Sequence, residues 1–238
     1  MNTERFVIVG GSSGIGLGLA RAALDASAEV LLVGRSADKL RQAADQLDAP
    51  GRVQTQAADT TVEEEVRQLF EHCGEFDHLV STAADVRYGP LREMPLEDAR
   101  RSIDSKLLSA ILLVKHGAAK IRRGGSVTFT SGIASQRPGP GGAVVAAVNG
   151  ALDALARALA LELAPVRVNT VSPGWVDTPI WARLAGDAKQ ERFARMAERL
   201  PVGRIGAVSD IAQAMLALAR NGYITGTTLQ VNGGHHLV

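Results

Sequence analysis

The sequence has little cysteine, little net charge and no long hydrophobic run. A single cysteine, Cys73, excludes an internal disulfide and a zinc site built on cysteines. The formal net charge of +1 offers no basic surface of the kind that nucleic acids require. The five histidines show no metal-ligand spacing, and no uninterrupted apolar run reaches the roughly 18 residues of a membrane span. We therefore expect no nucleic-acid partner, no metal and no membrane span.

Strand-like and helix-like segments alternate along the whole chain. Hydrophobic residues make up 46% and charged residues 21% of the 238 residues, which excludes disorder and suffices for one domain. Residues 1–5 enter a predicted strand directly and show no cleavable signal pattern, which predicts a cytoplasmic location. The alternation predicts an α/β fold with a doubly wound parallel sheet, a single three-layer α/β/α domain of the Rossmann type over residues 1–238. We expect strands at 6–9, 29–33, 52–56, 78–80, 125–130, 166–171 and 227–231, and helices at 17–26, 37–47, 62–72, 96–121, 150–163 and 208–219.

A glycine-rich turn follows the first predicted strand and precedes the first predicted helix. Its sequence is Val-Gly-Gly-Ser-Ser-Gly-Ile-Gly over residues 9–16. Gly10 can adopt φ angles closed to other residues, Gly14 lets the backbone approach a pyrophosphate, and Gly16 allows the helix to pack tightly on the strand. Free N–H groups at the helix start favour an anion. A turn without a ligand is the alternative, but the flanking strand and helix favour a nucleotide site that includes Ser12, Ser13 and Ile15.

Several further motifs occur in a recognisable order. They are Asp59, Thr82-Ala83-Ala84, Arg167-Val168-Asn169, the run from Ser172 to Pro179, and the run from Gly226 to Gly234. With the glycine loop, they make the chain resemble the short-chain dehydrogenase/reductase family over essentially its whole length. The resemblance implies a nicotinamide cofactor and an oxidoreductase that acts on a small-molecule carbonyl or alcohol. It also implies a homotetramer or homodimer, in which the predicted helices 96–121 and 150–163 pair across a two-fold axis.

The end of the second predicted strand indicates which nicotinamide cofactor is used. NAD-selective enzymes usually carry an acidic residue there for the ribose 2′-hydroxyl, whereas this chain has Gly34 followed by Arg35. A guanidinium suits a 2′-phosphate, and the hydroxyls of Ser12, Ser13 and Ser36 can donate to the same group. Arg35 as a solvated surface arginine is the alternative. We expect NADP(H).

The family resemblance assigns other cofactor contacts. Asp59 corresponds to the aspartate that faces the adenine, with Thr60 beside it, although it could instead cap the next helix. Thr82, Ala83 and Ala84 stand where the family has Asn-Ala-Gly. The segment that holds the nicotinamide carboxamide corresponds to Pro173, Gly174, Val176 and Thr178.

The catalytic positions depart from the family pattern. The family uses Asn, Ser, Tyr and Lys, and the corresponding residues here are Lys106, Gly132, Val145 and Asn149. Valine cannot donate a proton, and loss of a positioned acid removes roughly 10²–10⁴ in rate. The Asn and Lys positions have exchanged residue types, so an ammonium could reach the same region from the opposite side. The alternative is a solvated or interface Lys106 with Asn149 as a polar remnant.

Three residues are candidates for the missing chemistry: Lys106, Ser131 and Tyr88. Tyr88 lies in a predicted loop that can line the substrate cleft, or it packs on the surface. Ser131 reaches the cleft if Gly132 lets the strand end bend; otherwise it is a buried hydroxyl. Trp175 and Trp181 belong to the segment 175–200, which in relatives forms a mobile lid; they shape an apolar pocket or anchor that lid.

Two functional hypotheses follow. The first is an NADP(H)-dependent oxidoreductase with an atypical active site. The second is a catalytically silent NADP(H)-binding protein that senses redox state or regulates an active relative.

Overall fold

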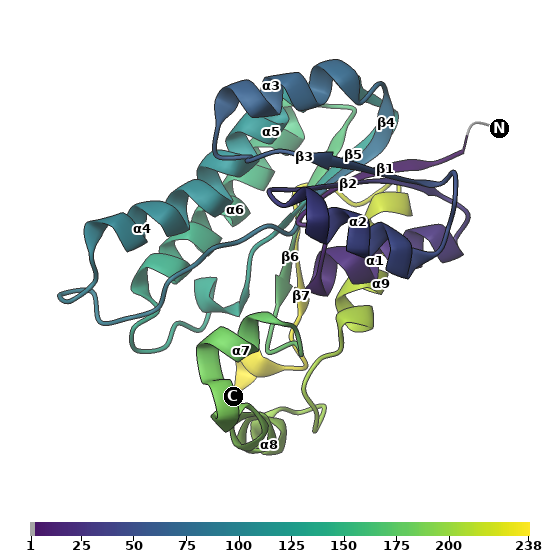
Figure 1. Ribbon diagram of the computed structural model, residues 1–238. Helices are drawn as coiled ribbons and strands as arrows, with labels where there is room; N and C mark the ends of the chain where they lie inside the picture. The colour runs from purple at the N-terminus through teal and green to yellow at the C-terminus, as the bar shows by residue number, and fades with distance from the viewer. Residues whose placement is uncertain (1–2) are drawn as a thin grey trace.

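Parallel strands form one central sheet in the computed structural model, which describes residues 3–238 with the exception of the side chain of Arg183 (Figure 1). The strand order is β3-β2-β1-β4-β5-β6-β7, and every neighbouring pair is parallel. The order changes direction between β1 and β4, and ligands of open α/β sheets bind beside such a point, at the carboxyl ends of the strands. The strands are β1 Arg5–Val9, β2 Glu29–Gly34, β3 Val53–Ala57, β4 Phe76–Ser81, β5 Ile121–Thr130, β6 Arg167–Pro173 and β7 Thr228–Val231.

Helices cover both faces of the sheet, as the alternation predicted. One face carries α1 Gly14–Asp25, α2 Ala37–Leu47 and α9 Val208–Arg220. The other carries α3 Glu63–His72, α5 Ser109–Gly117 and α6 Ala143–Glu162, with α4 Leu96–Ile103 packed against α6. The predicted three-layer, doubly wound fold is therefore confirmed.

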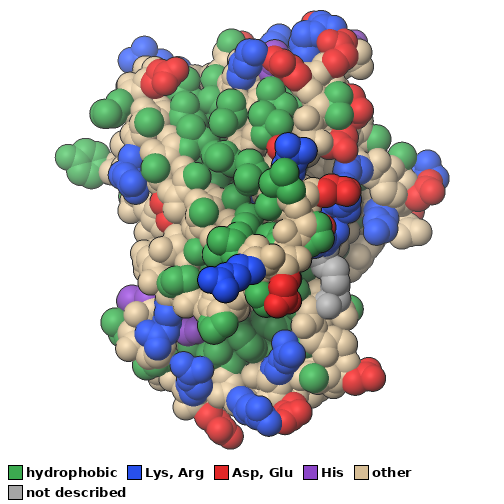
Figure 2. All heavy atoms as spheres, turned by 90° about the vertical axis from the view of Figure 1, so that its left-hand side faces the viewer, with side chains coloured by type: hydrophobic (Ala, Val, Ile, Leu, Met, Phe, Trp, Pro, Cys, Tyr) green, Lys and Arg blue, Asp and Glu red, His purple; other side chains and the backbone are tan. Residues whose placement is uncertain are grey.

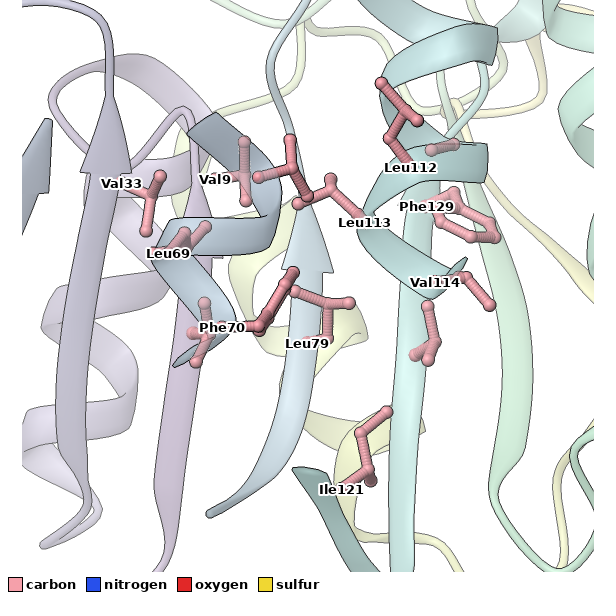
Figure 3. Packing of buried hydrophobic residues seen from close by; sticks show 14 of the residues in the cluster. Val9, Val33, Leu69, Phe70, Leu79, Leu112, Leu113, Val114, Ile121 and Phe129 are labelled. Atoms are coloured by element: carbon pink, nitrogen blue, oxygen red, sulfur yellow. The ribbon is translucent and has the colours of Figure 1, made fainter. Parts of the chain in front are cut away.

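The strands supply both hydrophobic cores because their side chains alternate between the two faces. In β1, Phe6 and Ile8 belong to one core, and Val7 and Val9 belong to the other. Figure 3 shows the second of these, where strand side chains meet those of α3 and α5. Burial on both faces explains why these strands read as continuous apolar runs in the sequence.

The predicted helix 96–121 is wrong as a single element. It divides into α4, a π-helical turn η1 Asp104–Leu108 and α5, and a 3₁₀ turn η2 Ala118–Lys120 then leads into β5. The π turn contains Lys106, whose buried side chain bonds to Asn149 of α6 and to Ser131, the residue that follows β5. Such turns disturb the α-helical register and often lie at functional sites. Hydrophobic periodicity does not reveal a register change that a distant contact stabilises.

The second correction concerns α6, which begins at Ala143 and not at Gly150. The predicted loop 137–142 ends immediately before it. Val145, Val148 and Leu152 repeat at helical spacing and are buried, so the first two turns form part of the core. By length and composition α6 could cross a membrane, with 39% of the relevant window buried. This is weak evidence for a span, because core helices of soluble proteins meet the same criteria.

A small helical unit lies beyond the carboxyl end of β6. It consists of α7 Ile180–Ala185, a 3₁₀ turn η4 Gly186–Ala188 and α8 Lys189–Arg199. Figure 1 shows α7 and α8 below the sheet, next to the C-terminus. This unit coincides with most of the predicted lid segment 175–200.

Candidate active site

A cleft of about 790 Å³ opens at the carboxyl ends of the central strands. It is lined by all but two of the predicted cofactor residues: Gly10, Ser12, Ser13, Gly14, Ile15, Arg35, Asp59, Thr60, Thr82, Ala83, Ala84, Pro173, Gly174, Val176 and Thr178. Gly16 and Ser36 are not among the lining residues. Gly16 packs instead against the loop, and the hydroxyl of Ser36 accepts the N–H of Lys39 as the cap of α2. The sequence motifs thus gather at one place.

The glycine loop has the shape that a bound phosphate requires. Gly10 and Gly14 adopt φ values of +80° and +53°, which side chains rarely tolerate. A Cβ at Gly10 would lie 2.7 Å from Ala83 N and Thr82 Oγ1, and one at Gly16 would lie 2.3 Å from Gly10 O. Glycine at these positions lets the loop pack tightly against Thr82 and Ala83, and the start of α1 lines the cleft, where its N–H groups can bind a pyrophosphate. The residues present therefore fit a dinucleotide.

Arg35 stands at the edge of the cleft with no acidic residue next to it. Its side chain is exposed and forms no ion pair with another residue of the described range 3–238. Gly34 has only Leu40 and Ser12 near the place of a Cβ, at 3.7 and 4.0 Å. An acidic side chain would have room there, so its absence is not a matter of space. The position offers a phosphate a permanent cation.

The sequence left open whether Asp59 contacts the cofactor or caps the next helix, α3. In the structure Asp59 does not cap α3. Its carboxylate accepts hydrogen bonds from Thr61 N at 3.0 Å and from Thr61 Oγ1 at 2.7 Å. The N-cap of α3 is Val62, without a side-chain bond. Asp59 therefore sits in a local turn at the cleft wall, next to Thr60, whose hydroxyl accepts a bond from Ser109 at 2.7 Å.

The remaining predicted cofactor segments close the cleft from two sides. Thr82 donates its hydroxyl to Val9 O at 2.9 Å, which ties the end of β4 to the end of β1. On the opposite side of the cleft, a Cβ placed on Gly14 would lie 3.6 Å from side-chain atoms of Thr178 and Pro179. Gly174 N bonds Val231 O at 3.2 Å, so the segment after β6 is held by β7.

The four altered catalytic positions lie together in the same wall of the cleft. Val145 is 3% exposed and presents only methyl groups. One helical turn later, Asn149 accepts a hydrogen bond from Lys106 Nζ at 2.5 Å. The same ammonium donates to Ser131 O at 3.0 Å, and Asn149 Nδ2 donates weakly to Gly132 O at 3.4 Å. The exchanged residue types therefore meet, as one of the two hypotheses from the sequence required.

Lys106 is neither solvated nor at an outer face of the chain. Burial lowers the pKa of its ammonium to about 8, and the nearby carboxylate of Asp153 partly opposes that shift. A buried ammonium needs hydrogen-bond acceptors, which Asn149 and Ser131 provide. The wall of the cleft thus holds a cation that titrates not far above neutral pH.

Tyr88 and Ser131 differ in how free their hydroxyl groups are. The hydroxyl of Ser131 donates to Asn149 O at 3.2 Å and is buried. Tyr88 lies at the cleft in the loop after β4, is 52% exposed, and makes no hydrogen bond through its phenol with another residue of the described range. Desolvation raises the pKa of this phenol.

An aromatic cluster holds the helical unit of α7 and α8 beside the cleft. Trp175 and Trp181 have ring centroids 4.5 Å apart, and Phe193 meets Trp181 edge-on at 5.0 Å. Trp181 Nε1 also donates to Val176 O at 2.8 Å. The two tryptophans both line the cleft and anchor the unit, so the two interpretations from the sequence are compatible.

Sequence reasoning missed Arg192 of α8, which also lines the cleft. Nothing in the local pattern distinguishes this arginine from its exposed neighbours Arg195 and Arg199. Only the placement of α8 over the cleft brings its guanidinium there.

Comparison with known proteins agrees with this arrangement. The family described as enoyl-(acyl carrier protein) reductase matches residues 9–236. A short-chain dehydrogenase/reductase, ucsE of Acremonium sp, is 32% identical over 246 residues, covering 96% of this chain and 93% of the relative. The chain belongs to the short-chain dehydrogenase/reductase family. The family prediction made from the motifs is confirmed.

Solved structures of family members superpose on the whole chain. A small-chain dehydrogenase in complex with NADPH is 34% identical, with a TM-score of 0.84 and full coverage of both chains. An NADPH-bound short-chain oxidoreductase from Pseudomonas aeruginosa PAO1, described as containing an atypical catalytic center, is 29% identical with a TM-score of 0.91. It covers 98% of this chain and 96% of its own.

Proposed function

We propose that this protein is an NADP(H)-dependent oxidoreductase that acts on a carbonyl or alcohol group of a small molecule. The observation that carries the proposal is one continuous cleft from the glycine loop and Arg35 to the wall of Lys106 and Asn149. The cofactor is NADP(H), since similar solved structures are NADPH complexes, and since Gly34 and Arg35 stand where NAD enzymes typically carry an acid. When bound, this cofactor supplies or accepts the hydride.

The active site is atypical because its proton donor is not at the usual position. Val145 has no transferable proton, and Ser131 is committed to a backbone carbonyl. We assign the donor role first to Tyr88, whose phenol lines the cleft and has no hydrogen-bond partner among the side chains that the structure describes. Segment 175–200 acts as a lid over the substrate, with Trp175 and Trp181 as its apolar lining.

The test combines binding and turnover. Calorimetric titration should give a tighter dissociation constant for NADPH than for NADH. A panel of small ketones and aldehydes should then be reduced with NADPH, and Tyr88→Phe should lower kcat by about 10²–10⁴ without changing NADPH affinity. A Tyr88→Phe variant with unchanged kcat would contradict the assignment. A protein that binds neither dinucleotide would contradict the proposal itself.

The altered catalytic positions in the cleft wall also support a second candidate function. These positions are Lys106, Gly132, Val145 and Asn149. A catalytically silent NADP(H) binder, acting as a redox sensor or as a regulatory partner of an active relative, needs the glycine loop but no proton donor. The methyl groups of Val145 favour it. Tight NADPH binding together with no turnover across the panel would select this alternative.

We also propose a cytoplasmic homodimer or homotetramer. Figure 2 shows a face on which hydrophobic side chains gather, on the side of α4, α5 and α6. Exposed apolar residues of these helices and of η1 are Leu96, Ile103, Leu108, Ile111 and Leu161. Contiguous exposed apolar surface of this kind marks interaction sites. A single cysteine suits a reducing compartment.

A further inference from the structure

One arginine in the cleft wall has no carboxylate partner. Arg192 of α8 lines the cleft and donates a single long hydrogen bond, from Nη1 to Leu184 O at 3.3 Å. Among the side chains that the structure describes, no aspartate or glutamate forms an ion pair with it. A guanidinium has five N–H donors, so most of those of Arg192 are left for solvent or a ligand.

The cation on either side of Arg192 in α8 is paired. Lys189 forms an ion pair with Asp177 at 2.6 Å, and Arg195 pairs with Glu191 one helical turn away. Of these three basic residues, Arg192 is the one that lines the cleft. The unpaired charge of α8 is therefore placed where a ligand can reach it.

The acidic residues that line the cleft are bound to other groups. Asp85 pairs with Arg87 at 2.8 Å. The carboxylate of Asp59 accepts two hydrogen bonds from Thr61. Neither acid forms an ion pair with Arg192, so the described lining of the cleft does not neutralise this charge from within.

The surface that accompanies Arg192 is apolar. Besides Arg192, the described lining residues from α7 and α8 are Ile180, Trp181 and Leu184, and Trp175 lies beside Trp181 with ring centroids 4.5 Å apart. Apolar walls lower the local dielectric constant, which strengthens the attraction between a cation and a bound anion. A ligand that suits this part of the cleft has an apolar body and a negatively charged group.

We propose that Arg192 binds a carboxylate of the carbonyl substrate and thereby selects apolar carbonyl compounds that carry a negative charge. The planar guanidinium can donate two parallel hydrogen bonds to a carboxylate. The proposal rests on the proposed oxidoreductase function and names the class of its substrate. A phosphate of the cofactor is the alternative source of the same negative charge.

The first experiment measures binding without turnover. The chain has two tryptophans, Trp175 and Trp181, and both line the cleft, so tryptophan emission reports on its occupancy. Titrations into the protein, with and without saturating NADP⁺, would compare 4-formylbenzoate and 4-oxo-4-phenylbutanoate with their uncharged methyl esters. We expect at least one acid to bind about tenfold or more tightly than its ester, as for hydrogen bonds between charged groups, and the advantage to shrink at high salt.

Substitution of Arg192 should remove this advantage and nothing else. In Arg192→Gln the acid should bind no more tightly than its ester, whereas Arg192→Lys should keep part of the advantage, because it retains the charge without the planar fork. Ester affinity and Tm should stay unchanged, which separates ligand binding from a structural role through Leu184 O. Arg195→Gln is the matched control, because Arg195 pairs with Glu191 and is not among the residues that line the cleft.

Turnover with NADPH gives an independent readout. Arg192→Gln should raise KM for the preferred acid by about tenfold or more and leave its kcat unchanged, because the lost contact lies away from the reacting carbonyl. KM for the matching ester should not change. A fall in kcat for acid and ester alike would place Arg192 in the chemical step and overturn the proposal.

Each other outcome also has a definite meaning. Equal affinity of acid and ester for both pairs, or binding of none of the four compounds, overturns the proposal, as does an advantage that Arg192→Gln leaves intact. A loss of NADP⁺ affinity in Arg192→Gln that equals the loss of acid affinity assigns the arginine to a cofactor phosphate and overturns it too. An acid advantage that depends on Arg192, in a protein that binds no dinucleotide, contradicts the proposed function and leaves the anion site in place.

Discussion

Lys106 brings a positive charge into a wall of the cleft that has little contact with water. Burial lowers the pKa of its ammonium to about 8, from an ordinary value of 10.5. Between these values the unfolded chain binds more protons than the folded chain, so this group makes the free energy of unfolding rise with pH. The charged lysine is therefore most costly below about pH 8, and the cost is relieved as the pH approaches 10.5.

We expect Lys106→Met to remove that pH dependence. Urea unfolding at several pH values would give the difference in unfolding free energy between the unmodified protein and the variant. Above about pH 8, the unfolding free energy of the unmodified protein should rise relative to that of the variant. The rise should be at most about 1.4 kcal/mol per pH unit. Parallel pH profiles would mean that Lys106 titrates normally. Lys115→Met, at an exposed position on α5, is the matched control variant.

Arg35 gives a second prediction, on cofactor choice. The exposed guanidinium lies in the cleft wall without an acidic neighbour to bind it. Arg35→Ala should narrow the preference for NADPH over NADH by about 1–3 kcal/mol, the range for hydrogen bonds to charged groups. Arg41→Ala is a suitable control, because Arg41 pairs with Asp38 on α2 away from the cleft. Equal affinity of the unmodified protein for both cofactors would contradict the prediction.

A third prediction concerns restoring the family's usual residues. Val145→Tyr with Asn149→Lys adds a proton donor, but it also places a second ammonium beside Lys106. Two adjacent ammonium groups disfavour each other's charged form. We expect the triple variant that also carries Lys106→Asn to reduce simple ketones faster than the double variant does. Steady-state rates at saturating NADPH would decide, and a double variant that equals the triple would show that Lys106 does not interfere.

The unit of α7 and α8 is joined to the sheet mainly through aromatic contacts. Trp181 is 8% exposed, packs between Trp175 and Phe193, and bonds Val176 O. An ion pair of Lys189 with Asp177 at 2.6 Å adds a second, more solvated link. Opening of this unit should therefore depend chiefly on the aromatic cluster.

We expect Trp181→Leu to increase protease cleavage within residues 180–199 by about tenfold or more, because loss of a large buried ring favours local opening. Trp181→Phe should have a smaller effect, since it keeps an aromatic ring and loses only the indole N–H. Mass spectrometry of timed digests would locate the cuts. Cleavage that is unchanged in Trp181→Leu would contradict the role of this cluster as an anchor.

The apolar face in Figure 2 is the surface through which we propose that two copies of the chain associate. Part of the apolar surface of α6 belongs to the core of its own chain, because Leu155, Leu159 and Leu163 pack inward. The exposed positions of α6 include the small residues Ala147, Ala154 and Ala158, beside the larger Arg157, Leu161 and Glu162. Small residues let two helices approach closely, which suits a two-fold contact between copies of α6.

We expect light scattering at micromolar concentration to give two or four times the chain mass of 25.0 kDa. Ala154→Arg should lower that mass by placing a charge in the contact. Tyr223→Arg, at a fully exposed position outside these helices, should leave it unchanged. A mass near 25.0 kDa for the unmodified protein would refute association through this face.

Local sequence signals were sufficient for the fold and for most of the cofactor cleft. Alternating apolar segments predicted a parallel sheet with two covered faces, because strand and helix periodicities depend only on neighbouring residues. The loop from Gly10 to Gly16 predicted the phosphate cradle, because its backbone angles need glycine whatever lies around it. The family motifs added Asp59 and the segment after β6, which the fold then brought to one cleft.

Only the tertiary structure decided how the altered catalytic wall is built. The π turn at Lys106, the orientation of Asn149 and the space at Gly132 each depend on residues distant in the chain. Arg192 reaches the cleft in the same way, through the placement of α8. Burial and hydrogen bonding across elements are long-range effects, and a linear pattern does not contain them. The sequence determined which residues replace the usual set. The packing of η1, α6 and the segment after β5 determined that Lys106 bonds Asn149 and that Asn149 bonds Gly132.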